Sequence, residues 1–478
     1  MIQEKDYPGY KRYFRSAFEA QQHHIFRWWS ELNAEEKKHL LGQISTIDFQ
    51  FIQKLFHENT QQVAPPIRGK ISPPQIINVP HSSFEKKLAH EARIRGEDSL
   101  RKGEIAVLTV AGGQGTRLGS NRPKGTLPIT PITHKSLFRL HAEKIHATQQ
   151  KYHTCIPWFI MTSESNDFIS QTFFQSHQFF GLDPKQICFF TQKMLPVVDL
   201  NGKLLMDSPS NIVMSPNGHG GVIVALREKG ILNDMKRRGV KNIFYHQVDN
   251  VLIKIADPVF TGYHLKDNAE MSLKIVKKGR PEEKVGIVVS LNGHLHMIEY
   301  SELSREDMYA RNENDSLKYN AGNIAVHMIN IDFLERVYQK NNSLPYHAAF
   351  KKVSYIDEHG NAVKPHNNNA IKFESFIFDI LKYVDRGVIM EVLRDEEFSP
   401  VKNTDGADSP VTAKRDMTNL FGRWLRKAGI SIPTDAHGNV IGCIEISPLF
   451  ALDEEEVCLK VDEHMQYTGF LNLYVNPS

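Results

Sequence analysis

The sequence predicts an α/β fold in which a mixed, mostly parallel, Rossmann-like sheet is flanked by helices. Two observations support this prediction. From about residue 103, short apolar segments rich in β-branched residues alternate with longer segments of helical spacing, the order expected when helices join parallel strands. The first apolar segment also runs directly into a glycine-rich turn, and such sheets bind ligands beyond the carboxyl ends of their strands.

Each part of the chain has its own pattern. Residues 1–100 predict a helical N-terminal region, in which Asn33 and Glu36 have the spacing of a capping box. Five prolines between residues 63 and 80 predict an extended linker. In the α/β region, 101–404, the expected strands are 105–110, 158–161, 243–245 and 287–289, and the expected helices are 136–145, 168–177 and 222–228. In the last part, 405–478, the strand-like segments 441–449 and 471–475 predict a small β-rich C-terminal domain.

Composition excludes several classes of protein. The 478 residues are 41% hydrophobic and 24% charged, and their formal net charge of +3 is too small to argue for a nucleic-acid or membrane partner. The N-terminus has no signal-peptide pattern, and no apolar run is long enough to span a bilayer. Four cysteines without C-x-x-C spacing predict reduced thiols in a cytoplasmic protein. No heptad repeat stands out, so the oligomeric state stays open.

The strongest functional signal is the turn after the strand at 105–110. The backbone from Val110 through Gly112, Gly113 and Gly115 is expected to approach a ligand closely, with the glycines at positive φ. A turn of this kind aims several N–H groups at one anion. The alternative is a strand-to-helix turn in which the glycines are incidental.

Two cations follow this turn. Arg117 offers a fork of donors for phosphate oxygens, and Lys124 offers a compact point charge. The pattern is not a Walker A loop, and Leu118 stands where a Rossmann fingerprint needs its third glycine. The sequence therefore predicts a polyphosphate site of another kind.

Three further groups of residues are candidates for substrate binding. Asp249 and Asn250 follow a predicted strand, where a carboxylate would hold Mg²⁺ or only form an Asx turn. His219 lies among three glycines, in a loop suited to a base or a sugar, or in an ordinary surface loop. Side chains that recognise sugar hydroxyls and phosphates are dispersed through the rest of the chain: Glu299, Tyr300, Asn320, Lys372 and Lys402.

Taken in order, these motifs resemble those of the UDP-sugar pyrophosphorylases, most closely the UDP-N-acetylhexosamine pyrophosphorylases of eukaryotic type. The resemblance runs from about residue 108 to residue 403. It rests on A-G-G-Q-G-T-R-L-G with P-K-G, on F-F-T-Q-K-M-L-P at 189–196, on V-D-N at 248–250, and on matches at 299–302, 320–323, 371–374 and 398–403. It implies a nucleotidyltransferase fold and the Mg²⁺-dependent reaction of UTP with a sugar 1-phosphate.

The resemblance also implies a role for each matching residue. The nucleotide-binding turn would be Val110, Ala111, Gly112, Gly113 and Gly115. The phosphates of UTP would be held by Arg117, Lys124, Lys372 and Lys402, with Asp249 at the Mg²⁺. Arg117, Lys124 and Lys402 would be the catalytic residues. The uracil would contact Gln192 and Gly218. The sugar would be bound by His219, Asn250, Glu299, Tyr300 and Asn320.

Two departures from the family pattern bear on the sugar. The acetylhexosamine enzymes have P-D-G-N-G-G where this chain has P-N-G-H-G-G, so His219 replaces an asparagine that contacts the sugar. Ala370 replaces the glycine of the family's P-N-G-I-K. The sequence favours synthesis of UDP-N-acetylglucosamine. It leaves open a UDP-glucose or broad-range UDP-sugar pyrophosphorylase, and an inactive nucleotide-binding protein with the same fold.

Overall fold

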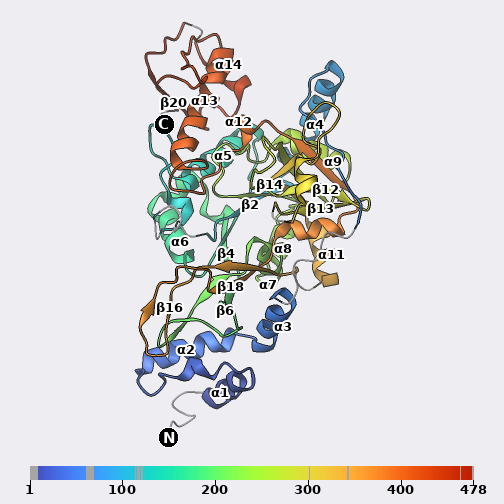
Figure 1. Ribbon diagram of the computed structural model, residues 1–478. Helices are drawn as coiled ribbons and strands as arrows, with labels where there is room; N and C mark the ends of the chain where they lie inside the picture. Colours follow the sequence, from blue (N-terminus) through green and yellow to red (C-terminus); the bar gives the residue numbers. More distant parts are fainter. Residues whose placement is uncertain are drawn as a thin grey trace. The chain divides into compact units, whose positions relative to one another are not determined.

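The computed structural model describes residues 9–60, 69–113, 115, 119, 122–300, 302–341, 344–462 and 464–475. They form two compact units, each assembled from three separate stretches of chain (Figure 1). Unit 1 consists of Met1–Arg68, Gln192–Ile223 and Ser343–Asp379, and unit 2 of Gly69–Thr191, Val224–Asn342 and Ile380–Ser478. None of the described helices is long and apolar enough to cross a membrane.

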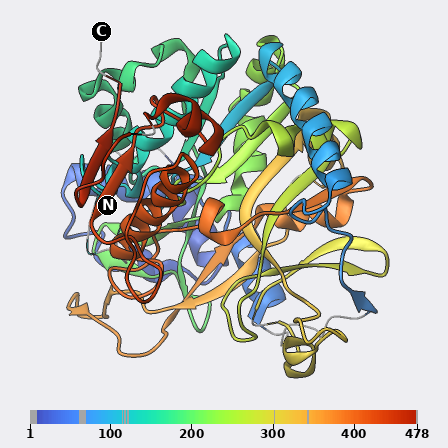
Figure 2. The ribbon, with the colours of Figure 1, turned by 90° about the horizontal axis from the view of Figure 1, so that it is seen from above.

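The limits of these units differ from the predicted divisions at residues 100 and 404. Helix α4 (Ser83–Arg101) belongs to unit 2, where it packs along α9 (Pro258–Lys266), as Figure 2 shows for the bright blue helix. The two backbones approach so closely that a Cβ on Gly96 would lie 1.9 Å from the carbonyl oxygen of Pro258. The residues beyond 404 share the main hydrophobic core of unit 2.

Unit 2 is built on a mixed sheet with ten strands among the described residues. The neighbours β10-β2-β3-β4 are all parallel, whereas β1, β12, β13 and β14 pair antiparallel. The predicted strands at 105–110, 158–161, 243–245 and 287–289 are confirmed as β2, β3, β10 and β12. The strands are β1 (Ile71–Ser72), β2 (Ile105–Val110), β3 (Trp158–Thr162), β4 (Ile187–Thr191), β10 (Asn242–Gln247), β11 (Met271–Lys277), β12 (Ile287–Leu291), β13 (His294–Ile298), β14 (Ala321–Asn330) and β19 (Gly387–Glu391).

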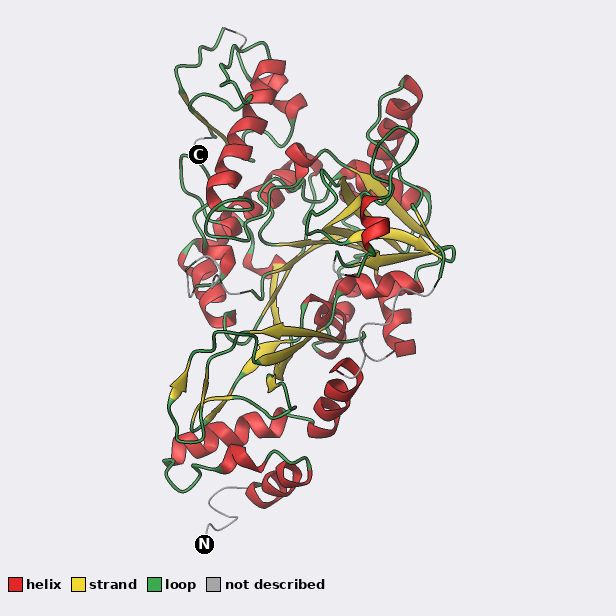
Figure 3. Ribbon diagram, in the orientation of Figure 1, coloured by secondary structure: helices red, strands yellow, loops and turns green. Residues whose placement is uncertain are grey.

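Helices lie on both sides of this sheet (Figure 3). For this reason β2 and β3 are buried along almost their whole length, and they read as continuous apolar runs rather than as alternating ones. The predicted helices at 136–145, 168–177 and 222–228 are confirmed as α5 (Leu137–Tyr152), α6 (Asp167–Ser176) and α7 (Val222–Glu228). The other α-helices of this region are α8 (Ile231–Arg237), α10 (Arg305–Tyr309), α11 (Ile331–Asn341) and α12 (Arg394–Glu397).

The C-terminal region contains more helix than the sequence analysis expects. The expected strand segments are present as β20 (Cys443–Ile446) and β21 (Phe470–Leu473), which pair parallel. The longest element, however, is α13 (Pro410–Lys427), followed by α14 (Glu454–Lys460). The start of α13 has a clear signal, because Ser409 and Thr412 form a capping box around a proline at the first helical position. The expectation of a β-rich domain is corrected accordingly.

Unit 1 packs the N-terminal helices against small antiparallel sheets. The helices are α1 (Tyr10–Glu19), α2 (Ala34–Thr46) and α3 (Phe49–Thr60), and the strands are β5 (Met194–Pro196), β6 (Val198–Asp199), β7 (Met206–Ser208), β8 (Asn211–Ile212), β9 (Met214–Pro216), β15 (His347–Lys351), β16 (Tyr355–Ile356), β17 (Ala362–Val363) and β18 (Ala370–Glu374). The predicted capping box is confirmed, since Glu36 N–H donates to Asn33 Oδ1 at 3.0 Å and Asn33 N–H to Glu36 Oε2 at 2.8 Å. One apolar cluster joins these helices to β6, β7, β8 and β18.

The predicted linker is extended where it is described, but it is also part of the sheet. Residues 61–68 lie outside the described residues. Ile71 and Ser72 form β1 and pair with Leu291 and Ser290 of β12. Further along, Ile77 bridges to Met390. This stretch therefore covers an edge of unit 2 rather than only connecting two domains.

Candidate functional site

The carboxyl edge of the parallel strands gathers the predicted phosphate-binding residues of unit 2. Strands β2 and β10 pair in parallel up to Val110 and Gln247, so the glycine turn and Asp249 leave the sheet at the same edge. Val248 N–H donates to the carbonyl of Val110 at 3.1 Å, which extends the pairing into the two turns. The topology thus brings together two motifs that are more than a hundred residues apart in the sequence.

The predicted sugar-binding residues of unit 2 converge at the same edge. Strand β14 is antiparallel to β10, so its first residues lie at this edge, and Asn320 directly precedes them. Glu299 and Tyr300 follow β13. Ile287 of β12 pairs both with the last residue of β13 and with Gly322 of β14, which places Glu299 and Asn320 near one another. The sugar contacts themselves stay a prediction.

Hydrogen bonds from one side chain hold the backbone at the start of the glycine turn. Asn166 donates its side-chain N–H groups to the carbonyls of Ala111 and Gly113, at 3.0 and 3.4 Å. A Cβ on Gly113 would meet no heavy atom of the described residues within 4 Å, so no packing against them requires glycine there. The expectation of positive φ is wrong for Gly113, whose φ lies outside the left-handed region. Arg117, the first predicted cation, lies outside the described residues.

Lys124 and Asp249 form an ion pair at this edge. The Lys124 Nζ and Asp249 Oδ2 atoms are 2.8 Å apart, and the two side chains are only 18% and 9% exposed. Lys124 is held in place because its backbone follows Pro123 and starts a short 3₁₀ turn. The backbone carbonyl of Asp249 accepts the N–H of Val401 at 3.0 Å. Lys402, the other predicted cation of unit 2, therefore follows a residue that is tied directly to Asp249.

Asn250 has a structural task that the sequence analysis did not foresee. Its Nδ2 donates to the carbonyl of Glu397 at 2.7 Å, and its Oδ1 accepts the N–H of Ser399 at 3.0 Å. The side chain is 3% exposed. These bonds fix the segment that leads to Lys402, whose Nζ lies 5.5 Å from the centre of the Phe398 ring. The sugar contact predicted for Asn250 stays untested beside this observed role.

In unit 1, the glycines around His219 are required by the protein itself. Gly218 has a φ of +83°, and a Cβ there would lie 2.4 Å from the carbonyl oxygen of Ser375. A Cβ on Gly220 would lie 2.6 Å from the backbone nitrogen of Phe376. The backbone around His219 is therefore approached closely, as the sequence predicts. In this structure the approaching group is the backbone of Ser375 and Phe376.

His219 holds this second segment. Its Nδ1 accepts the backbone N–H of Ile377 at 3.2 Å, and its ring packs on Phe376 and Phe378 at centroid distances of 5.3 and 5.6 Å. Burial lowers the pKa of His219 to about 4, so the ring is neutral near pH 7 and Nδ1 is available as an acceptor. The substitution that departs from the family loop thus has a structural use in this chain.

Two buried amides in unit 1 have unsatisfied acceptors. Gln192 Oε1 and Asn217 Oδ1 have no hydrogen-bond partner among the described residues, although the side chains are only 5% and 1% exposed. An unpaired buried carbonyl costs about 1–3 kcal/mol, so a ligand N–H at this position would be stabilising. Asn217 N–H donates to the carbonyl of Lys193 at 3.0 Å, which places both amides at the start of the β5–β9 ladder. Asn217 was missed from the sequence; its position beside Gly218 was the available signal.

The last predicted lysine lies in the other unit from Lys402. Lys372 is in the middle of β18, opposite Ala349 of β15, and so belongs to unit 1. The predicted set is therefore divided: the glycine turn, Lys124, Asp249 and Lys402 lie in unit 2, and Gln192, Gly218, His219 and Lys372 lie in unit 1.

The sheet and the residues at its carboxyl edge define an α/β protein of the nucleotidyltransferase class. The chain belongs to the UTP–glucose-1-phosphate uridylyltransferase family, whose model matches residues 50–416. It is 38% identical over 429 residues to the UDP-N-acetylglucosamine pyrophosphorylase of Saccharomyces cerevisiae, which covers 86% of this chain and 90% of that relative.

Two solved structures show the same fold over most of the chain. A putative UDP-N-acetylglucosamine pyrophosphorylase from Entamoeba histolytica is 36% identical, with a TM-score of 0.76, covering 84% of this chain and all of that one. The uridine diphosphate N-acetylglucosamine pyrophosphorylase of Trypanosoma brucei is 27% identical, with a TM-score of 0.82, covering 100% and 99%. These matches confirm both the predicted fold class and the family resemblance drawn from the motifs.

Proposed function

We propose that the protein is a uridylyltransferase that condenses UTP with N-acetylglucosamine 1-phosphate to give UDP-N-acetylglucosamine and pyrophosphate. The main structural support is the ion pair of Lys124 with Asp249, at 2.8 Å, at the same sheet edge as Gly113, where the described residues leave room for a ligand. The ammonium of Lys124 can contact phosphate oxygens, and the carboxylate of Asp249 can bind the Mg²⁺ that accompanies them. The names of the S. cerevisiae and E. histolytica relatives favour the acetylated sugar over glucose.

The reaction requires charge stabilisation and positioning rather than a covalent intermediate. A phosphate oxygen of the sugar phosphate attacks the α-phosphorus of UTP in line. A new P–O bond forms as the bond to the β-phosphate oxygen breaks, and pyrophosphate leaves with that electron pair. Lys124 and Lys402 neutralise the charge on the transferring phosphates. Glu299 and Asn320 orient the sugar for attack.

The uracil is recognised by the two buried amides of unit 1. Gln192 Oε1 lacks a partner among the described residues, and the N3–H of uracil is a donor of the right kind. Asn217 supplies a second amide beside Gly218. Gln192 Oε1 would gain, from the single N–H donor of the base, the hydrogen bond that it lacks among the described residues.

Mg²⁺ belongs to the same proposal. Among the described residues no group of three His, Cys, Asp or Glu side chains is placed to hold a metal. Nucleotide sites commonly bind Mg²⁺ through one or two carboxylates together with phosphate oxygens, and Asp249 supplies such a carboxylate at the phosphate-binding edge. When bound, the ion would withdraw charge from the phosphates. We further propose a cytoplasmic location, consistent with four cysteines that are all free.

A panel of sugar phosphates tests the proposal. The purified protein, UTP and Mg²⁺ are incubated with N-acetylglucosamine, N-acetylgalactosamine or glucose 1-phosphate, and pyrophosphate release and the product mass are measured. We expect the highest kcat/KM with N-acetylglucosamine 1-phosphate. A clear preference for glucose 1-phosphate would establish the alternative enzyme. Release of no pyrophosphate with any of them would indicate the inactive nucleotide-binding protein.

A further inference from the structure

The loop that follows β10 is held by the side chains of one helix. Residues 248–253 include Asp249, and the backbone carbonyls of Val248, Val251 and Ile253 accept hydrogen bonds from α5. His141 Nε2 donates to the carbonyl of Val248 at 2.8 Å, and Lys144 Nζ donates to the carbonyls of Val251 and Ile253 at 2.7 and 2.8 Å. Because His141 and Lys144 are three residues apart, they lie on one face of α5. Together their hydrogen bonds hold the loop before and after Asp249.

The protonation of both groups suits this task. His141 is fully buried, and burial lowers its pKa well below the ordinary value. The ring is therefore neutral and donates from Nε2 only, which agrees with the lack of a hydrogen-bond partner at Nδ1 among the described residues. Burial also lowers the pKa of Lys144 to about 7. Whether charged or neutral, its amine keeps two N–H donors for the two carbonyls.

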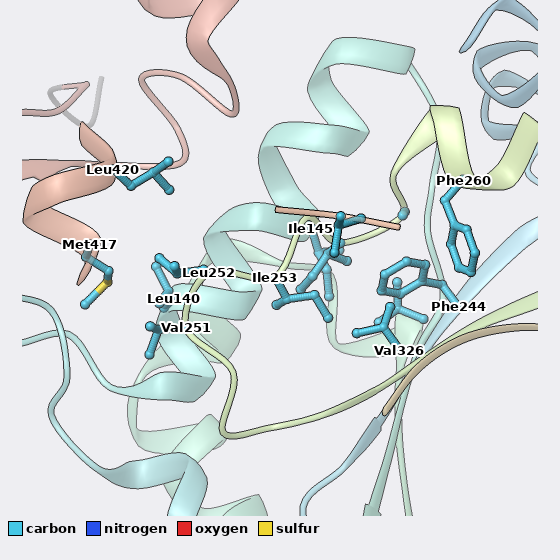
Figure 4. Close-up of a cluster of buried hydrophobic side chains, with 14 of the residues drawn as sticks. Leu140, Ile145, Phe244, Val251, Leu252, Ile253, Phe260, Val326, Met417 and Leu420 are labelled. Atoms are coloured by element: carbon cyan, nitrogen blue, oxygen red, sulfur yellow. The ribbon is translucent and has the colours of Figure 1, made fainter. Parts of the chain in front are cut away.

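The loop also borders an internal cavity, although Val251, Leu252 and Ile253 are themselves buried in the core. A cavity of about 350 Å³ lies among α5, α13 and the backbone of residues 251–259. Figure 4 shows Val251 and Leu252 beside Leu140 of α5, with Met417 and Leu420 on α13. Since interiors are otherwise packed to the density of organic crystals, a loop that borders such a space depends more strongly on its polar contacts.

We infer that His141 and Lys144 are positioning residues for uridylyl transfer, which hold the loop so that Asp249 stays in register with Lys124. The inference rests on the proposed function for its kinetic consequence. Neither residue belongs to the predicted catalytic or binding set. They hydrogen-bond to backbone carbonyls of the loop and do not touch the reacting atoms. A displacement of the loop by about 1 Å is enough to lower turnover by about two orders of magnitude.

Lys144→Met is the direct test, because methionine keeps the apolar stem and removes both hydrogen bonds. We expect kcat to fall 10- to 100-fold while the KM for the sugar phosphate stays within about twofold. Amide exchange in the peptide covering residues 248–253 should become faster. Lys144→Arg restores donors and has room beside the cavity, so it should recover most of the lost kcat.

Lys151→Met is the matched control. Lys151 lies on the same helix and borders the same cavity, but its Nζ pairs with Asp453 and Glu456 at 3.2 and 2.6 Å and makes no contact with the loop. This variant should leave kcat and the exchange of residues 248–253 unchanged. If Lys144→Met does not fold, His141→Phe and His141→Gln give the same comparison, because only glutamine keeps a donor.

The outcomes separate the inference from the proposed function. Unchanged kcat and unchanged exchange in Lys144→Met would overturn the inference. Equal losses of kcat in Lys144→Met and Lys151→Met would also overturn it, since the effect would then be general to the cavity. If the wild-type protein transfers nothing, the proposed function fails, while the exchange measurement still tests whether Lys144 holds the loop.

Discussion

The two glycine-rich turns of this protein look alike in sequence and differ in structure. In unit 1, the glycines around His219 are packed against Ser375 and Phe376, where a Cβ would lie 2.4 or 2.6 Å from backbone atoms. In unit 2, a Cβ on Gly113 would meet none of the described residues within 4 Å. Packing within the chain therefore explains the glycines of the first turn, whereas the described residues leave room for a ligand at Gly113.

The largest effect is expected from the cation beside the open turn. Lys124→Ala should lower kcat about 10³-fold, because it removes a charge aimed at the phosphates. Since its pair with Asp249 is partly buried, the free energy of unfolding should fall by about 1–3 kcal/mol. Steady-state kinetics and urea denaturation measure the two effects. Near-normal turnover would contradict the assignment of Lys124.

Lys135→Ala is the control for this variant. Lys135 pairs with Glu143 at 2.7 Å, and the two side chains are 12% and 4% exposed, which is comparable burial in the same unit. We expect a similar loss of stability with kcat close to that of the wild type. A parallel loss of activity would show that any broken ion pair in unit 2 disables the enzyme.

The packed turn should respond through stability. Gly218→Ala places a side chain at a φ of +83° and 2.4 Å from a backbone oxygen, so we expect the free energy of unfolding to fall by about 2–4 kcal/mol. Gly230→Ala separates strain from clash, because Gly230 has a φ of +70° but nothing within 4 Å. It should lose only about 1 kcal/mol. If urea denaturation gave the same loss of unfolding free energy for Gly218→Ala and Gly230→Ala, the contact with Ser375 would not contribute to the effect.

The open turn should respond through binding. Gly113→Ala adds a methyl group that meets none of the described residues, so stability should change by less than about 0.5 kcal/mol. The affinity for UTP, measured by calorimetry, should fall about tenfold because the methyl group stands where the ligand approaches. Gly279→Ala, at another glycine with open space, should change neither quantity. Unaltered UTP affinity in Gly113→Ala would make the turn structural after all.

The smallest effect concerns pH and His219. Its pKa in the folded protein is lowered to about 4, below the ordinary value near 6.5. The unfolded chain therefore binds a proton first as the pH falls, so the stability that neutral His219 provides is present above pH 6.5 and is lost as the pH falls towards 4. Between pH 7 and 5 the wild type should lose about 1–2 kcal/mol more than His219→Asn. Identical pH dependence of urea unfolding in both proteins would refute this.

Local signals were readable from the sequence, and long-range partners were not. The strand at 105–110 and the Asn33–Glu36 capping box depend on residues close in the chain, and both were predicted correctly. The roles of Asn250 and His219 depend on Glu397 and Ile377, which lie about 150 residues away. Residue types showed that these side chains form hydrogen bonds, but the identity of the partner is set only by the folded topology.

The same limit explains the division into units. No local pattern marks residues 191–192 or 223–224 as a crossing between units, because α7 continues through the second crossing without a break. Residue type alone predicts positive φ at Gly113, yet its φ lies outside the left-handed region and its carbonyl accepts from the Asn166 side chain. The sequence located the turn correctly, while its shape depends on a residue more than fifty positions away.

The N-terminal helices cover an apolar surface formed by two later stretches of the chain, including Val198, Leu204 and Phe373. A shortened product that began at residue 69 would expose this surface to water and would be prone to aggregate. For the same reason, a chimaera with a related enzyme must exchange all three stretches of unit 1 together. Residues 9–60 are thus an integral part of the core of unit 1.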